Sequence, residues 1–403
     1  MKILYIHQYF HTPSEPGGTR SYWISRELIR RGHDVVMVTS TNKFHPQPGV
    51  EMVEGIKVIY IKNEYSNYMS KLQKVKSFCS FLNKAIGEAK KEDNVDIVYA
   101  TSTPLTVGAV AMRLKSAKGW PYVFEVRDLW PEFPIQIGAI RNKFIIGILR
   151  KLEKDIYQKA NHIVALSPGM RDGVVAAGIP ADKVSMIPNM SKPDEFYPRP
   201  HNHKIAEEFG VDLSKFNIIH FGSMGVANGL DYILNTAEIC QHMDINDVEF
   251  LFLGDGATLP ELQKMSEGKN LRNVKFLGNH EMKTVSEIVN LCDLSITSFK
   301  NLPILQTNSP NKLFDSLSAG KPIVVNSAGW TKDLVEKENC GFFVNPDSPQ
   351  DFVDKIKLYK GNTEILKTWA ENARNLSESV YDKSILSRQV AEVIERHYTN
   401  ESD

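Results

Sequence analysis

The sequence contains little cysteine and no long apolar run. Its 403 residues include four cysteines, none in a Cys-x-x-Cys spacing, so we expect neither a disulfide framework nor a zinc site, and a reducing, cytoplasmic location fits better. No stretch approaches the roughly 18 consecutive apolar residues of a membrane span. The chain reaches His7 and Gln8 too soon for the core of a signal peptide. Any contact with a membrane is therefore expected to be peripheral.

Two ligand-binding patterns are also missing. The first expected strand-to-helix turn lacks the Gly-x-Gly-x-x-Gly pattern of dinucleotide-binding sites. No Asp-x-Asp sits at the end of an expected strand. We therefore expect no metal ion and no bound cofactor in whatever reaction this chain performs.

The sequence has no net charge, but its charges are unevenly distributed. Of the 48 Lys and Arg, 28 lie in residues 1–200 together with 19 of the 48 Asp and Glu, so this half carries +9 and residues 201–403 carry −9. A basic half indicates an anionic partner, although a solvated basic face without a specific partner is the alternative. The content of 42% hydrophobic and 24% charged residues is typical of a globular protein.

Short apolar strands alternate with amphipathic helices along the chain, which predicts parallel sheets covered by helices. The strands expected first are residues 2–6, 34–39, 56–61, 97–101, 122–126, 162–165 and 184–187. A polar stretch from Lys192 to His203 is interpreted as a linker. The strands expected after it are residues 217–222, 248–254, 274–277, 294–297, 323–326 and 341–344. The fold class is therefore α/β, with two doubly wound, Rossmann-like domains and a cleft between them.

Residues 305–325 carry the strongest functional signal. Polar residues precede an apolar-periodic run that ends at Gly320, before Pro322, which predicts a helix with start and stop signals. The first turn of such a helix offers unpaired N–H groups to an anion. Lys312 adds a charge suited to a phosphate, and Asp315, one turn on, can accept hydrogen bonds from ribose hydroxyls. The segment indicates a nucleotide-diphosphate site; an ordinary loop, helix and strand is the alternative.

This segment resembles the donor site of retaining family 4 glycosyltransferases of the GT-B fold. In that family two glutamates eight positions apart flank the site, and here the second corresponds to Asp315 and the first to Thr307. The resemblance extends in order through residues 166–170, 187–189, 250–256 and 273–278. It implies donor contacts from a set of residues spread over the chain: Gly17, Gly18, Ser223, Met224, Gly225, Asn228, Gly278, His280, Thr307, Ser309, Pro310, Asn311, Lys312 and Asp315. A surface position is the alternative for His280.

Gly17 and Gly18 follow the first strand and precede an amphipathic helix. Glycines at such a turn let the backbone approach a ligand closely. Matching loops of the family lie against the donor diphosphate and the acceptor, so Arg20 is expected to pair with a phosphate and to act in catalysis together with Lys312. A tight turn that merely requires glycine is the alternative.

A charged segment follows the strand at residues 122–126. Charges at the carboxyl end of a parallel strand are costly unless they face a cleft. The segment resembles the acceptor-side loop of the family, where a His or Asp lies beside the reacting sugar, so Asp128 is expected to orient the acceptor hydroxyl or to take its proton. Glu125, Arg127 and Trp130 are placed on the acceptor side. A structural ion pair of Arg127 with Glu125 or Glu132 is the alternative.

The loop at residues 222–229 departs from the family. Many members place an Arg and a Lys there to stabilise the leaving diphosphate, whereas this chain has Ser223 and Asn228. Lys312, Arg20 and the backbone N–H groups of Ser223–Gly225 and Asn311–Lys312 are the expected substitutes. A similar neutral loop occurs in enzymes resembling bacterial polysaccharide transferases that use UDP-N-acetylamino sugars, including N-acetylfucosamine.

The resemblance predicts a retaining glycosyltransferase that moves a sugar from a UDP-sugar to a polyprenyl-diphosphate-linked or other saccharide acceptor during assembly of a bacterial surface polysaccharide such as O-antigen or capsule. The acceptor-binding domain is expected over residues 1–192 plus about 382–403, the last helix (roughly residues 384–397) crossing back to it. The nucleotide-sugar domain is expected over residues 193–381. Alternatives on the same fold are a sugar-nucleotide epimerase, a phosphorylase and a non-catalytic sugar-nucleotide binder.

A basic amphipathic helix is expected within residues 65–85, where Lys71, Lys74 and Lys76 accompany apolar residues. Such a helix suits an anionic bilayer, and the enzyme is expected at the inner face of the cell membrane, without a nucleic-acid partner. Core packing of the same apolar stripe is the alternative.

Overall fold

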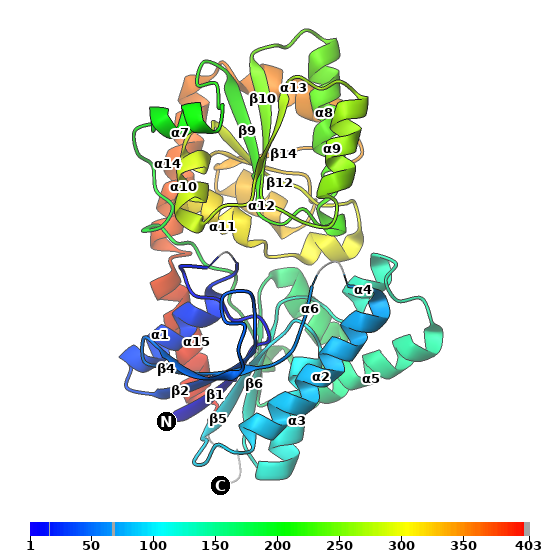
Figure 1. Cartoon of the computed structure of the whole chain (residues 1–403), viewed down its shortest axis with the longest axis vertical. Helices are drawn as coiled ribbons and strands as arrows, with labels where there is room; N and C mark the ends of the chain where they lie inside the picture. Colours follow the sequence, from blue (N-terminus) through cyan, green and yellow to red (C-terminus); the bar gives the residue numbers. More distant parts are fainter. Residues whose placement is uncertain (16, 67–68, 399–403) are drawn as a thin grey trace. The chain divides into compact units, whose positions relative to one another are not determined.

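A computed structural model describes residues 1–15, 17–66 and 69–398, except for the side chain of Lys71. The chain divides into two compact units. The first unit comprises Met1–Pro188 with Lys383–Asp403, and the second comprises Asn189–Asp382. Figure 1 shows both units as α/β structures.

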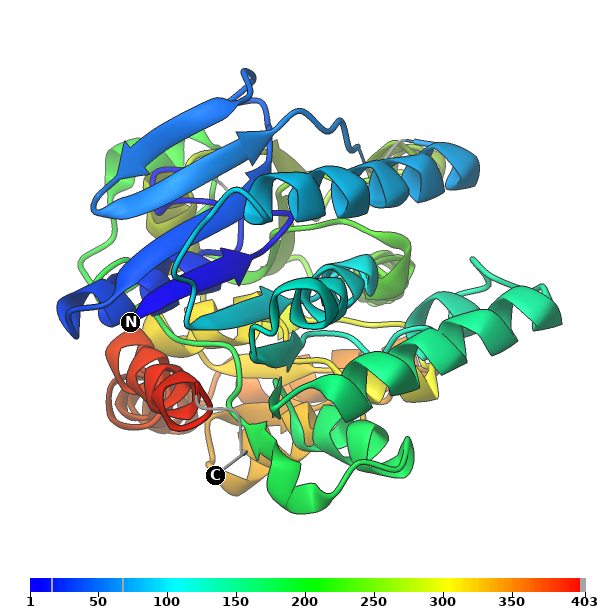
Figure 2. The ribbon, with the colours of Figure 1, turned by 90° about the horizontal axis from the view of Figure 1, so that it is seen from below.

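The first unit contains an eight-stranded sheet in the order β3-β4-β2-β1-β5-β6-β7-β8. The strands are β1 (Lys2–Ile6), β2 (Asp34–Ser40), β3 (Gly49–Val53), β4 (Ile56–Ile61), β5 (Ile97–Thr101), β6 (Tyr122–Val126), β7 (His162–Ala165) and β8 (Val184–Met186). Strand β3 was not predicted from the sequence. It pairs antiparallel with β4 at the edge of the sheet (Figure 2) and is largely exposed, so it lacks the continuous apolar run of the buried parallel strands.

Helices cover this sheet, and the last helix of the chain is one of them. They are α1 (Arg20–Arg30), α2 (Lys71–Ala89), α3 (Thr106–Lys118), α4 (Glu132–Gln136), α5 (Lys143–Lys159), α6 (Pro168–Ala176), the short η1 (Ala181–Lys183) and α15 (Lys383–Arg396). Helix α15 packs beside α1 (Figure 1), where Glu395 pairs with Arg31 and, at 2.8 Å, with His33. The expected return of the last helix to the first domain is confirmed.

The second unit contains a six-stranded parallel sheet in the order β11-β10-β9-β12-β13-β14. Its strands are β9 (Phe216–Phe221), β10 (Val248–Leu253), β11 (Val274–Gly278), β12 (Leu294–Thr297), β13 (Ile323–Val325) and β14 (Gly341–Phe343). Its helices are α7 (His203–Glu208), η2 (Val226–Asn228), α8 (Asp231–His242), α9 (Leu259–Gly268), α10 (Met282–Asn290), η3 (Pro303–Thr307), α11 (Asn311–Ser318), α12 (Trp330–Lys337), α13 (Pro349–Tyr359) and α14 (Thr363–Ser379). Among the described residues, every strand except β3 therefore matches a predicted one, and the predicted fold class of two Rossmann-like domains is confirmed.

From the sequence, residues Lys192 to His203 are interpreted as the linker between the domains. The boundary between the units falls at Pro188, and this segment belongs to the second unit. Phe196 is fully buried in a core cluster with Ile219 and Phe221. The segment is mostly polar, so its composition did not indicate that Phe196 packs in the core.

Candidate active site

The start of helix α11 presents a buried lysine. Pro310 precedes the helix, and Lys312 lies in its first turn with its Nζ 3.1 Å from Nε2 of His220, near the end of β9. Burial lowers the pKa of Lys312 to about 7. Burial, followed by the nearby Lys312 charge, lowers the pKa of His220 well below its ordinary value, so the imidazole is neutral. The ammonium of Lys312 therefore has a neutral neighbour and no described carboxylate partner, which leaves its charge available to an anion.

One turn further along α11, Asp315 forms a buried ion pair. Its Oδ1 lies 3.0 Å from Nζ of Lys192, a residue that follows the unit boundary. Burial raises the pKa of Asp315 in spite of the lysine. Burial alone would lower the pKa of Lys192, but Asp315 and Glu195 outweigh it and the net shift is upward. Asp315 is therefore buried and paired one helical turn from Lys312.

The loop at residues 222–229 is fixed by close backbone contacts. A Cβ at Gly254 would lie 2.0 Å from the carbonyl oxygen of Gly222, and one at Gly256 would lie 2.4 Å from that of Met224. These approaches explain the two glycines after β10. Gly222 adopts φ +98°, and a Cβ there would lie 3.9 Å from Cε of Lys312. The loop therefore passes directly beside the lysine.

Three of the residues predicted to contact the donor also have partners within the protein. The Met224 side chain is buried in the core, and its N–H donates to the carbonyl oxygen of Asp255 at 2.9 Å. The N–H of Gly225 donates to Oδ1 of Asn228 at 3.0 Å. Asn228 is itself buried and shapes the loop. Met224, Gly225 and Asn228 therefore support the loop, and the donor contacts predicted for them and for Ser223 stay predictions.

The remaining residues predicted on the donor side follow the carboxyl ends of strands β11 and β12 in the second sheet. Ser309 is buried, and its Oγ accepts the N–H of Asn189 at 3.2 Å; Thr307 Oγ1 donates to the carbonyl oxygen of Ile304 at 2.7 Å. Asn311 is exposed in the first turn of α11. Beyond β11, His280 bonds through Nε2 to the carbonyl oxygen of Leu277 at 2.7 Å, and Gly278 is exposed with φ +77°.

In the first unit, Arg20 and Glu125 form a buried structural pair. Nε of Arg20 donates to Oε2 of Glu125 at 2.8 Å, and its other nitrogens donate to the carbonyl oxygens of Ile187 and Pro188. Tyr99 donates to the same carboxylate at 2.7 Å. Because both charged groups are fully enclosed and satisfied, the phosphate role predicted for Arg20 and the acceptor role predicted for Glu125 are withdrawn. The ion pair forms with Arg20, and not with Arg127 as the alternative held.

Polar groups gather at the carboxyl ends of β1 and β6. Burial raises the pKa of Asp128 to about 6, although the adjacent Arg127 opposes the shift. The N–H of Arg127 donates to Oγ of Ser102 at 2.9 Å. His7 lies near Arg127 and bonds through Nδ1 to Oγ of Ser21 at 2.9 Å, and burial, with Arg127 and His11, lowers its pKa well below the ordinary value. Asp128 is thus a carboxyl group whose pKa lies above the ordinary value for aspartate.

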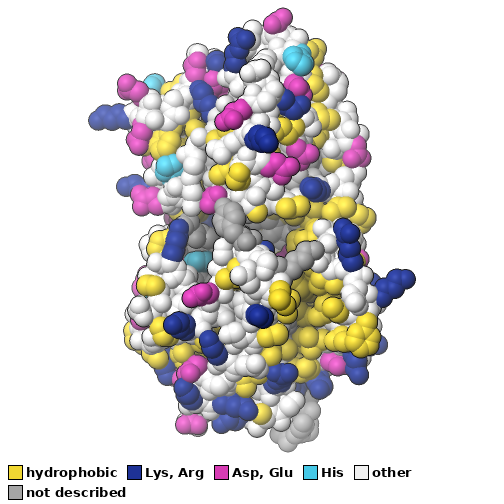
Figure 3. Space-filling model, turned by 45° about the vertical axis from the view of Figure 1, so that its right-hand side comes forward, with side chains coloured by type: hydrophobic (Ala, Val, Ile, Leu, Met, Phe, Trp, Pro, Cys, Tyr) yellow, Lys and Arg dark blue, Asp and Glu magenta, His cyan; other side chains and the backbone are white. Residues whose placement is uncertain are grey.

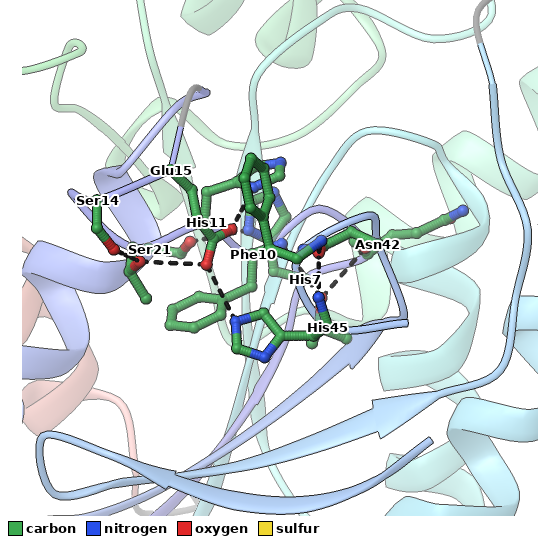
Figure 4. Close-up of polar contacts among 12 residues, drawn as sticks. His7, Phe10, His11, Ser14, Glu15, Ser21, Asn42 and His45 are labelled. Carbon is green, nitrogen blue, oxygen red and sulfur yellow. Dashed lines mark hydrogen bonds and ion pairs between the residues drawn. The ribbon is translucent and has the colours of Figure 1, made fainter. Parts of the chain in front are cut away.

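The loop between β1 and α1 is organised around Glu15 (Figure 4). The buried carboxylate lies 2.9 Å from Nδ1 of His11 and 3.1 Å from Nε2 of His45, and it accepts a hydrogen bond from Thr12. Gly17 adopts φ +145°, and a Cβ there would lie 2.7 Å from the His11 ring. The glycine predicted to approach a ligand is therefore also required by the packing of the loop; Gly18 beside it is partly exposed.

A row of aromatic rings runs from the end of β1 to the segment after β6. Ring centroids are 5.2 Å apart between Tyr9 and Tyr65, 5.6 Å between Tyr65 and Phe78, and 6.4 Å between Phe78 and Trp130. All four side chains are partly exposed. Trp130, predicted on the acceptor side, ends this row two residues from Asp128.

Sequence reasoning missed three site residues: His220, Lys192 and His7. His7 follows strand β1, and His220 lies next to the end of strand β9. A titratable residue at such a place can indicate a functional site, because burying it is costly without a partner. Lys192 gave no such signal, since its partner Asp315 is distant in the sequence. Among the described residues, no group of three or more His, Cys, Asp or Glu could hold a metal ion.

Two family models match the chain. A glycosyl transferase 4-like domain matches residues 17–190, and glycosyl transferases group 1 matches residues 215–359. The alpha-galactosylglucosyldiacylglycerol synthase of Streptococcus pneumoniae is 22% identical over 62% of this chain and 65% of its own length. The chain therefore matches slightly less than two thirds of that relative.

Solved structures resemble the whole chain. A sucrose-phosphate synthase from Thermosynechococcus elongatus has a TM-score of 0.81 at 14% identity, covering 98% of both chains. Anabaena HepE, in complex with UDP and glucose, has a TM-score of 0.73 at 19% identity, covering 98% of this chain and all of its own. At these identities the likeness shows the shared fold.

Proposed function

Because the chain belongs to the glycosyltransferases of the GT-B fold, with both of its units matched by glycosyl transferase models, we propose that it transfers a sugar from a UDP-sugar to a saccharide or lipid-linked acceptor in glycan biosynthesis. We further propose that the anomeric configuration is retained.

The observation that carries this proposal is that Lys312 and Asp315 lie one turn apart at the start of α11. Lys312 supplies an uncommitted cation and the helix supplies free N–H groups, which together suit the diphosphate. Asp315, fixed by Lys192, suits the ribose hydroxyls of UDP. HepE, which has the same fold, is known in complex with UDP and glucose, which supports a UDP-sugar as the donor.

In the proposed reaction, Lys312 acts on the leaving group and Asp128 acts on the acceptor. Negative charge grows on the UDP oxygens as the glycosidic bond breaks, and the Lys312 ammonium stabilises it. The acceptor hydroxyl attacks on the face that UDP leaves, and its proton passes to Asp128 or to the departing phosphate. Asp128 fits this role because its pKa of about 6 makes it a carboxylate with appreciable basicity at neutral pH. The aromatic row ending at Trp130 offers flat apolar faces to the acceptor.

We propose an N-acetylamino sugar as the donor group and a bacterial surface polysaccharide as the product. The neutral Ser223 and Asn228 in the loop at residues 222–229 support this choice, since they resemble the loop of enzymes for such sugars. A donor screen with several UDP-sugars, using cell membranes as acceptor, tests it; transfer of a neutral hexose in preference to every N-acetylamino sugar would contradict it.

The basic half of the sequence supports a peripheral position at the inner face of the cell membrane. None of the helices among the described residues is long and apolar enough to cross a bilayer. Helix α2, predicted to lie on the membrane, buries Phe81, Leu82 and Ala85, so core packing accounts for that part of its stripe. Lys71 was placed in this surface, but its side chain lies outside the described part, as do residues 67–68.

The donor assignment is tested by UDP binding to Asp315→Ala. Ribose contacts exist equally in the ground and transition states, so calorimetry should show affinity weakened by roughly 1.5–3 kcal/mol. A folded variant with unchanged UDP affinity would remove Asp315 from the site. Lys264→Ala, a change on α9 at a lysine that takes no part in the proposed site, is the control.

Two further assays separate the alternatives. Incubation with a UDP-sugar alone should leave it intact, whereas an epimerase would convert it without an acceptor. Addition of a chelator should leave turnover unchanged; complete loss would show that a metal ion takes part.

A further inference from the structure

Helix α5 exposes large apolar side chains in its first two turns. Phe144 is 77% exposed, Ile145 47% and Ile148 53%. The side chain of Asn142 caps the helix by accepting the N–H groups of Phe144 and Ile145 at 2.9 and 3.2 Å, so these residues belong to a well-formed helix start. The core contacts of α5 come from its far end, where Ile156 and Tyr157 are buried. At the start of the helix, the side chains of Phe144, Ile145 and Ile148 remain largely exposed.

Basic residues outnumber acidic ones around this face. Between Glu132 and Glu153 the sequence contains no acidic residue, and its basic residues there are Arg141, Lys143, Arg150 and Lys151. Glu132 pairs with Arg150 at 3.2 Å, while Arg141, Lys143 and Lys151 are exposed. Figure 3 shows apolar side chains gathered on this side of the first unit, with Lys and Arg side chains among and around them.

We propose that the start of α5 is the element that inserts into an anionic lipid bilayer, with Phe144, Ile145 and Ile148 entering the interface and Arg141, Lys143 and Lys151 contacting lipid headgroups. This inference deepens the proposed membrane association, for which the sequence had indicated helix α2. It rests on the proposed function only in that a transferase with a lipid-linked acceptor has a reason to bind the membrane. An apolar face of this kind, bordered by long basic side chains that can extend to the headgroups, is the pattern of an interfacial helix.

The charge pattern favours lipid over protein. A face that paired symmetrically with a second copy of this chain would bring the exposed Arg141, Lys143 and Lys151 close to basic residues of the copy, which is unfavourable. An anionic bilayer supplies both an apolar layer and a uniform negative surface, and it needs no shape complementarity. Elsewhere an equally exposed apolar residue, Leu358 (64% exposed), has Asp354 among its neighbours on α13, so it offers a matched control.

The test is sedimentation of the purified full chain with vesicles of phosphatidylcholine alone or with one third phosphatidylglycerol. The wild type should bind the anionic vesicles and bind the neutral ones weakly. Replacing the three apolar residues by serine (Phe144→Ser, Ile145→Ser, Ile148→Ser) should lower the partition coefficient at least about tenfold, because most of the inserted area is lost. Leu358→Ser should bind as the wild type, and so should Lys74→Glu with Lys76→Glu on α2 if α5 is the main contact.

A fluorescence measurement gives a second, positive readout. Phe144→Trp should shift its emission to shorter wavelength when anionic vesicles are added, since the ring would leave water. Equal binding of the wild type and the serine variant, no emission shift, or a wild-type dimer that the serine variant converts to monomer would each overturn the proposal. Vesicle binding requires neither donor nor acceptor, so Asp315→Ala should bind vesicles normally even if it cannot bind UDP, and the two proposals fail separately.

Discussion

At the scale of single residues, Lys312 is the group on which the donor site depends. Its ammonium is buried beside the neutral His220, so a bound diphosphate would be its main counter-charge. Lys312→Ala should cost on the order of 2–4 kcal/mol of transition-state stabilisation, about 30- to 1000-fold in kcat/KM. Steady-state kinetics with a UDP-sugar measures this. Activity within threefold of the wild type would remove Lys312 from the site.

The same lysine predicts a pH dependence of UDP binding. Burial lowers the pKa of Lys312 in the free protein to about 7, so its charge is present below pH 7 and is lost as the pH rises through 7. The diphosphate favours the charged form, so the pKa is higher in the complex. Between pH 7 and 9 the Kd for UDP should therefore increase, by up to about tenfold per pH unit. Lys312→Met should flatten this dependence; a wild-type Kd that is constant over this range would contradict the assignment.

At the scale of elements, the position of the loop at residues 222–229 depends on Gly254. A Cβ there would lie 2.0 Å from a backbone oxygen of Gly222, and φ is +135°, so neither space nor conformation accommodates alanine. Gly254→Ala should lower the free energy of unfolding by at least about 1–3 kcal/mol and displace the loop from Lys312, which weakens UDP binding as well. Gly268→Ala is the matched control, because its Cβ would meet no atom within 4 Å. Denaturant unfolding and calorimetry compare the two, and equal stability of both variants would contradict the packing argument.

At the scale of the whole molecule, stability follows the spatial units and not the order of the sequence. Ile394, in α15, is fully buried in the first unit although the second unit precedes it in the chain. Ile394→Ala should destabilise the first unit by about 2–5 kcal/mol. Hydrogen exchange should show faster exchange in β1, β2 and α1 and unchanged protection in β9 and β10. Val353→Ala, at an equally buried position of the second unit, should give the opposite pattern.

The sequence by itself determined nearly all of the architecture. Short, mainly apolar runs marked the buried parallel strands, because a strand covered by helices on both faces buries most of its side chains. Edge strand β3 escaped detection, since an exposed strand has no such requirement. The start of α11 was also determined locally: proline, lysine and the stop at Gly320 lie close together in the chain.

Only the tertiary structure decided what the charged residues do. Arg20 looked free to bind a phosphate, but Glu125, which is 105 positions away, neutralises it. The sequence indicated that Lys192 is part of a linker, whereas in the structure it forms an ion pair with Asp315. The sign and number of charges can be read from a sequence, but the effect of a charge depends on its distance to a partner and on its burial, and folding sets both.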